Sequence, residues 1–342
     1  MKKIASLILL MCMALTLIAC AKADPKEDEY AEANKLLEQG DYEAAYALFK
    51  KLGDYKDAEK KVSYFRYMPT GHFIEYFYDG EEETATYTIT LNEQNLPATI
   101  VEEYNDGYKH TCNYTYNKFG RVEHLKCSDT EGAKFSYDAT YDANGNYINE
   151  TITDEDGNVR KFDYTYNEKG QQVKVVTNAP DTYHSYTIEY DEEGRESKVT
   201  YVYEDGTYVE EITYNEEGKI SNSLAGMNGV KSSSNYHYDE KGRLIEIIHK
   251  KDGEEVGFNK ITYNDKDKIL KEHIRIDVYD YTKTYEYDEK GNAVKVIYSD
   301  TEGDSDITTS TYTLVYLPFE YTEKEWSEIC YSTQCWDLLH MQ

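Results

Sequence analysis

Histidine and cysteine are the side chains with which this sequence could bind a metal ion or attack a substrate. Its eight histidines stand at positions 72, 110, 124, 184, 237, 249, 273 and 340, and no two of them form the close pair of an HExxH motif. A glycine-rich phosphate loop and the nucleophile elbow of hydrolases are also missing. A solvated surface accounts for the 66 acidic residues. We therefore expect no catalytic residue, no metal site and no cofactor, and predict that the protein is not an enzyme.

The N-terminus has the form of a bacterial export signal. Two lysines precede an apolar run that ends at Cys20, a pattern typical of secretory signal peptides. The residues Leu17-Ile18-Ala19-Cys20 resemble the lipobox of bacterial lipoproteins; an ordinary signal peptide with an incidental cysteine is the alternative. The resemblance implies that residues 1–19 are removed and that Cys20 is lipidated, with two acyl chains anchoring it stably. We expect an extracytoplasmic protein attached to a bacterial membrane, with residues 20–28 as its tether.

Composition restricts the partners of the 342-residue chain. Its 37 Lys and Arg stand against 66 Asp and Glu, for a net charge of −29 and a mean hydropathy of −0.80. Such a charge repels phosphate, which argues against nucleic acid as a partner. The aromatic residues are mostly tyrosine, 37 against 9 Phe and 2 Trp. The apolar material is therefore largely amphipathic.

Residues 29–67 show helical periodicity in three segments, which end at Gly40, at Gly53 and before Pro69-Thr70-Gly71. The stretch 36–45, LLEQGDYEAA, resembles the joint between the two helices of a tetratricopeptide repeat. The resemblance covers little more than one repeat, whereas solenoids need several. We expect a packed helical spacer rather than a peptide-binding groove.

Residues 72–317 are built from about nine copies of a repeat of about 24 residues. Each copy carries a Tyr-Asn/Asp-x-x-Gly turn, and an Asp/Asn/Glu-Gly turn falls midway between most of these. The first copy, at Leu91, is degenerate, and Asp267 stands where one glycine is expected. The repeat-turn residues are Tyr116, Gly120, Tyr141, Gly145, Tyr166, Gly170, Tyr190, Gly194, Tyr214, Gly218, Tyr238, Gly242, Tyr263, Tyr287 and Gly291.

Between the turns, apolar and polar residues alternate with period two, which predicts two antiparallel strands per repeat. Sheets of more than about ten strands usually curl or split. The fold class is therefore mainly β: a long antiparallel meander of hairpin repeats forming a curled sheet with its tyrosine face inside. A C-terminal helical cap is predicted over residues 318–342. Cys330 and Cys335 lie there and could pair within a loop, or remain free thiols.

The repeat also sets a register between neighbouring strands. If Tyr116 pairs with Glu123, three residues after the turn glycine, Cys112 stands directly opposite Cys127. An exported protein can keep a disulfide at such a position. We predict a bond between Cys112 and Cys127, with free thiols as the alternative.

The segment 236–244, YHYDEKGRL, resembles the YD repeat of RHS proteins, and the likeness extends over about residues 72–316. The resemblance implies a curled β-sheet and an association with carbohydrate. The chain departs from the family in a slightly longer period and in asparagine at several turns. It is too short for a closed shell and contains no recognisable toxin core.

Three functions remain open. The first is a non-catalytic surface module that binds glycan, cell wall or a surface protein through exposed tyrosines, of which Tyr147, Tyr183 and Tyr203 are out of phase with the inward face. The second is a structural or assembly scaffold with a protein partner. The third, an enzyme, would need a site assembled from distant repeats. We predict the first, because aromatic rings pack well on sugars and repetition adds avidity.

Overall fold

The computed structural model describes residues 24–78, 81–179, 183–227, 229–301, 303, 305–317, 319 and 321. The predicted signal peptide and Cys20 lie outside these residues, as do Cys330, Cys335 and nearly all of the predicted C-terminal cap. The chain divides into two compact units. One contains the helices and residues up to Met68, together with the stretch that begins at Leu314. The other is built on Pro69–Thr313.

The first unit contains three helices: α2 (Pro25–Glu38), α3 (Tyr42–Leu52) and α4 (Ala58–Val62). Side-chain oxygens of Asp24 and Asp41 accept hydrogen bonds from backbone N–H groups at the starts of α2 and α3. The prediction that the third helical segment reaches Tyr67 is wrong, because β1 begins at Phe65. The core of this unit consists of Ala33, Ala45, Phe49, Leu52, Ala58, Phe65 and Leu314.

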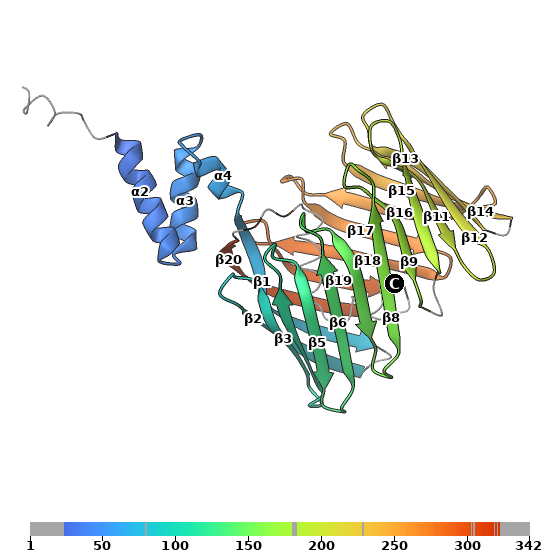
Figure 1. The fold of residues 1–342 in the computed structure, drawn as a ribbon, viewed down its shortest axis with the longest axis horizontal. Helices are drawn as coiled ribbons and strands as arrows, with labels where there is room; N and C mark the ends of the chain where they lie inside the picture. Colours follow the sequence, from blue (N-terminus) through green and yellow to red (C-terminus); the bar gives the residue numbers. More distant parts are fainter. Residues whose placement is uncertain are drawn as a thin grey trace, which may run out of the picture. The chain divides into compact units, whose positions relative to one another are not determined.

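Twenty strands in the described part of the chain form one antiparallel sheet, in which each strand pairs with the next in sequence (Figure 1). The strands are β1 (Phe65–Tyr78), β2 (Glu81–Leu91), β3 (Pro97–Tyr104), β4 (Lys109–Tyr116), β5 (Val122–Asp129), β6 (Lys134–Tyr141), β7 (Tyr147–Thr153), β8 (Val159–Tyr166), β9 (Gln172–Thr177), β10 (Ser185–Tyr190), β11 (Glu196–Val202), β12 (Thr207–Tyr214), β13 (Ile220–Met227), β14 (Val230–Tyr238), β15 (Leu244–Lys251), β16 (Glu254–Tyr263), β17 (Ile269–Ile276), β18 (Tyr279–Tyr287), β19 (Ala293–Asp300) and β20 (Ser305–Tyr316). The predicted meander of hairpins is confirmed.

The sheet is closed, which corrects the prediction of a curled one. β1 pairs with β2 on one side and with β20 on the other, so the first and last strands meet. The Thr311 hydroxyl lies 3.3 Å from the carbonyl oxygen of Gly71, and the Thr70 hydroxyl lies 3.4 Å from that of Thr311. The Pro69-Thr70-Gly71 stretch, read from sequence as a helix breaker, is thus part of the closing strand. Closure removes the free edges that an open sheet would expose.

One face of the sheet carries the core, and we call it the inward face. Its largest buried cluster lies on β1–β5 and includes Ile100, Cys112 and Leu125, and a smaller one joins Ile152, Phe162 and Val175. From β10 onward most side chains on this face are half-buried. The inward face is therefore packed at one part of the sheet and more open at the other.

A β-bulge at each repeat turn changes the predicted register by one residue. Cys112 does stand opposite Cys127, but Tyr116 pairs with Val122 rather than Glu123, because the register shifts between Thr115 and Tyr116. The same shift recurs at other repeat tyrosines, among them Tyr141 and Tyr238. A bulge inserts one unpaired residue beside the turn. The strand residues therefore keep the predicted register, whereas the turn tyrosine pairs one residue away from its predicted partner.

Candidate functional site

The repeat tyrosines other than Tyr166 join their repeat to the one before it. The Tyr238 hydroxyl donates to the carbonyl oxygen of Ile220 at 2.9 Å, and Tyr263 donates to Leu244 at 2.7 Å. In each case the acceptor is the first residue of the strand that follows the repeat turn of the preceding repeat. This explains why the position is tyrosine rather than phenylalanine. The other tyrosines that make this bond are Tyr116, Tyr141, Tyr190, Tyr214, Tyr287 and Tyr312.

The turn glycines take the left-handed conformation for which glycine is favoured, with Gly120 at φ 75° and Gly242 at φ 76°. The same holds for Gly145, Gly170, Gly194, Gly218 and Gly291. Asp267 keeps this conformation at φ 60° without being glycine, and Asn95 does so in the degenerate first copy.

Tyr166 is the last residue of β8 and is half-buried, and this burial raises its pKa. The predicted repeat residues are thus structural.

Substituting Tyr238 by phenylalanine is expected to lower the free energy of unfolding by about 1 kcal/mol, because the carbonyl of Ile220 loses its hydroxyl partner. Chemical denaturation of the purified protein measures this change. Tyr279→Phe is the matched control, since Tyr279 is 69% exposed on the β17–β18 hairpin. Equal stability of the two variants would show that the inter-repeat bond contributes nothing.

A cluster of tyrosine rings occupies the inward face at β10–β12. Tyr201 lies 5.3 Å from Tyr186 and 5.8 Å from Tyr208, measured between ring centroids, and Tyr183 lies 5.4 Å from Tyr201. All of these rings are half-buried, and burial raises the pKa of Tyr201. The tyrosine cluster, as named below, is Tyr183, Tyr186, Tyr201, Tyr203 and Tyr208.

The tyrosines expected to be out of phase with the inward face do not form an outer patch. Tyr183 and Tyr203 belong to the tyrosine cluster. Tyr147 lies 4.7 Å from Tyr141 and 5.6 Å from Tyr164, between ring centroids. Tyr147 pairs with Tyr141 after the register shift. The extra residue of the bulge therefore turns Tyr147 toward the inward face, whereas simple alternation would place it on the other face.

A row of polar side chains crosses the packed part of the inward face. His72, Tyr87, Glu102 and His110 follow one another as directly opposed residues on β1–β4, and Asp129 opposes His110 on β5. The Tyr87 hydroxyl donates to Glu102, which is fully buried. One carboxylate oxygen of Glu102 lies 4.0 Å from Nδ1 of His110. Burial and the neighbouring carboxylate of Glu102 raise the pKa of Tyr87.

The first member of the row, His72, is buried beside a serine. Its Nδ1 lies 2.8 Å from the hydroxyl of Ser310 on β20, and the two residues are 5% and 8% exposed. Burial lowers the pKa of His72 to about 4, so the ring is neutral at pH 7, and among the described residues its Nε2 has no hydrogen-bond partner. Neither side chain lines the cavity beside the disulfide. The pair joins β1 to β20.

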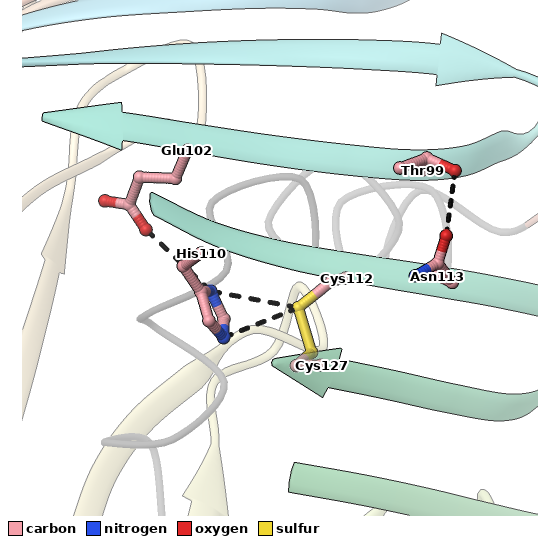
Figure 2. The surroundings of a disulfide bond; sticks show 6 residues. All are labelled: Thr99, Glu102, His110, Cys112, Asn113 and Cys127. Atoms are coloured by element: carbon pink, nitrogen blue, oxygen red, sulfur yellow. Dashed lines mark hydrogen bonds and ion pairs between the residues drawn. A yellow bond between two sulfur atoms is a disulfide. The ribbon is translucent and has the colours of Figure 1, made fainter. Parts of the chain in front are cut away.

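Figure 2 shows the disulfide that joins Cys112 to Cys127 across β4 and β5. Their Cα atoms are 4.1 Å apart, and both side chains are buried. His110 lies beside them, two residues before Cys112 on the same face. A cavity at this point has about 20 Å³ for the centres of water-sized molecules, enough for a water molecule. Its lining includes His110, both cysteines, Asp129 and Phe135.

The polar row was not predicted, because no two histidines form a close pair in the sequence. His72 and Ser310 are 238 residues apart and meet only because the sheet closes. The position of His110 beside Cys112 could have been found, because residues two apart on a strand share a face. Glu102 lies opposite His110 across the preceding hairpin.

No helix among the described residues is long and apolar enough to cross a bilayer. No family model matches the sequence, and no curated protein matches it.

Three solved structures illustrate what the chain resembles. The TcdB2–TccC3–TEV crystal structure matches over 68% of this chain, with 14% identity and a TM-score of 0.34. A Tc holotoxin pore from Photorhabdus luminescens matches over 70% of the chain, with 15% identity and a TM-score of 0.32. A porin-like protein from Bacteroides uniformis matches over 72% of this chain and 98% of its own, with 9% identity and a TM-score of 0.32. The chain spans only 15% and 16% of the two toxin structures. TM-scores this low do not establish a shared fold.

Proposed function

We propose that the protein is a non-catalytic lipoprotein, anchored to the outer side of a bacterial membrane through Cys20, whose closed sheet binds carbohydrate. The export signal and the lipobox-like residues support the anchoring and the location. The observation that carries the binding role is the tyrosine cluster on the inward face. Five rings are gathered there without being fully buried, while equivalent residues on β1–β5 are packed into a core.

The chemistry of the cluster suits a sugar. Aromatic faces pack on the C–H faces of sugar rings, and tyrosine hydroxyls can hydrogen-bond to sugar hydroxyls. Glu196 and Glu210 are close enough to act electrostatically on Tyr201, and both could accept hydrogen bonds from a ligand. A chain with a net charge of −29 repels acidic polysaccharides. The proposed ligand is therefore a neutral or amino-substituted glycan of a cell wall or host surface.

Binding of the purified protein to a panel of neutral, amino-substituted and acidic glycans tests this function. We expect binding to the first two classes, and Tyr201→Ala is expected to weaken it by about tenfold, equivalent to about 1.4 kcal/mol. Tyr279→Ala is the matched control, because it removes an exposed ring outside the cluster. Calorimetry gives the dissociation constants, and circular dichroism confirms that each variant is folded.

If the folded protein binds none of the glycans in the panel, the carbohydrate proposal is overturned. It would favour a scaffold with a protein partner, for which the β17–β18 hairpin offers exposed apolar surface. Val278 is 87% exposed and Tyr279 is 69% exposed there, and apolar residues presented together to solvent are typical of contact sites.

A further inference from the structure

Three side chains able to bind a metal ion converge at the disulfide (Figure 2). Nδ1 and Nε2 of His110 each lie 4.0 Å from Sγ of Cys112. The ligand atoms of His110, Cys112 and Cys127 all lie within 4.8 Å of one another. The three residues are only 8%, 1% and 7% exposed. Carbohydrate binding at the tyrosine cluster leaves this group without a role.

We propose that reduction of the Cys112–Cys127 disulfide converts this group into a zinc site whose ligands are the two thiolates and the His110 imidazole. A thiolate of a dithiol reductant attacks one sulfur and forms a mixed disulfide, and its second thiol then displaces the protein sulfur. The protein gains two electrons and two protons, and the reductant leaves as its own disulfide. Zn²⁺ then displaces the two thiol protons as it binds.

The distances suit a tetrahedral zinc ion. Zinc bonds of about 2.3 Å to sulfur and about 2.0 Å to nitrogen place sulfur and nitrogen about 3.6 Å apart, and two sulfurs about 3.8 Å apart. The sulfur–nitrogen distance at Cys112 is already 4.0 Å. Once the disulfide is cleaved, rotation about the side-chain bonds can separate the sulfurs. The strands need not move, because the two residues already stand directly opposite each other.

Glu102 is placed to orient the imidazole. It is fully buried and directly opposite His110, with its Oε2 atom 4.0 Å from Nδ1. A carboxylate beside one ring nitrogen of a histidine directs the other nitrogen toward the metal. Glu102 is thus a positioning residue rather than a ligand.

The donor set and the cavity both favour zinc. Two thiolates and an imidazole suit zinc, whereas calcium and magnesium prefer oxygen ligands. The adjoining cavity of about 20 Å³ can hold a water molecule as the fourth ligand. The site is therefore expected to bind zinc with three protein ligands and one water molecule when reduced, and not to bind it when oxidised.

Cobalt(II) and zinc binding to the purified protein test this proposal, in a background where Cys330 and Cys335 are serine. With a dithiol reductant we expect one Co²⁺ per chain, a near-ultraviolet thiolate-to-cobalt charge-transfer band and displacement by Zn²⁺. His110→Gln is expected to weaken zinc binding by at least tenfold. Glu102→Gln should weaken it by about tenfold and keep the two-thiolate band, as a positioning role requires. His124→Gln is the matched control, because His124 lies on β5, the strand that carries Cys127, at an exposed position.

Three results would overturn the zinc site: a reduced, folded protein without the thiolate band, equal cobalt binding by the oxidised protein, or undiminished zinc binding by His110→Gln. If circular dichroism shows that reduction unfolds the chain, Zn²⁺ is expected to restore the folded spectrum. Failure to restore it, or equal restoration when Cys112 and Cys127 are both serine, also contradicts the proposal.

Discussion

Replacing Gly257 by alanine is expected to lower the free energy of unfolding by about 3 kcal/mol. A Cβ atom at this position would overlap the carbonyl oxygen of Arg275 and would lie 2.7 Å from the Cα of Ile276. Both are backbone atoms of β17, the strand paired with β16 at this point. The new methyl group therefore cannot be accommodated by rotating a side chain, and β16 and β17 must move apart.

Chemical denaturation of the Gly257→Ala protein measures the loss. The sign is informative, because a glycine-to-alanine change at an unstrained site usually stabilises a protein by about 0.4–1 kcal/mol through the unfolded chain. Gly226→Ala on β13 is the matched control: its nearest contact would be the Val230 carbonyl oxygen at 3.3 Å, and we expect a change of less than about 1 kcal/mol. A Gly257→Ala protein at least as stable as wild type would contradict the close approach of the two strands.

Acidification is expected to destabilise the protein through His72. Burial lowers the pKa of this imidazole from its ordinary 6.5 to about 4, so between these pH values the unfolded chain binds a proton that the folded chain does not. Stability from this residue is complete above about pH 6.5 and falls as the pH drops toward 4. The loss amounts to about 2 kcal/mol between pH 7 and pH 5.

The His72→Gln variant isolates this effect from the other groups that titrate. Unfolding free energies measured by denaturation at pH 7, 6 and 5 should fall more steeply for wild type than for the variant, whatever their absolute values. His237→Gln, at an exposed side chain on β14, is the matched control. Parallel curves for wild type and His72→Gln would show that His72 is not buried in neutral form.

Local regularity explains what could be predicted from sequence. Alternation and the spacing of turns depend on residues within one hairpin, and they were sufficient to predict the meander and to place Cys112 opposite Cys127. The bulge at Tyr116 was not predicted, because an unpaired residue changes neither the turn motif nor the repeat length. Its effect is seen in Tyr147, which alternation assigned to the wrong face.

Long-range pairing explains what could not be predicted. No pattern within Pro69-Thr70-Gly71 identifies it as a strand, because its partner on β20 is about 240 residues away in sequence. The contact between His72 and Ser310 depends on the same pairing. Neither closure nor the start of the polar row could therefore be predicted. His110 and Glu102, in contrast, pair within a single hairpin.

The pairing of β1 with β20 has a consequence for how the chain folds. Contacts between residues 238–241 apart in sequence cannot form until nearly the whole chain is available for folding, and closing so long a loop costs more entropy than closing any hairpin. Until then, β1 presents an unpaired edge able to recruit strands from other chains. A chain whose β20 is not yet free to pair would therefore remain an aggregation-prone intermediate, and it is at this stage that holdase chaperones would act on the molecule.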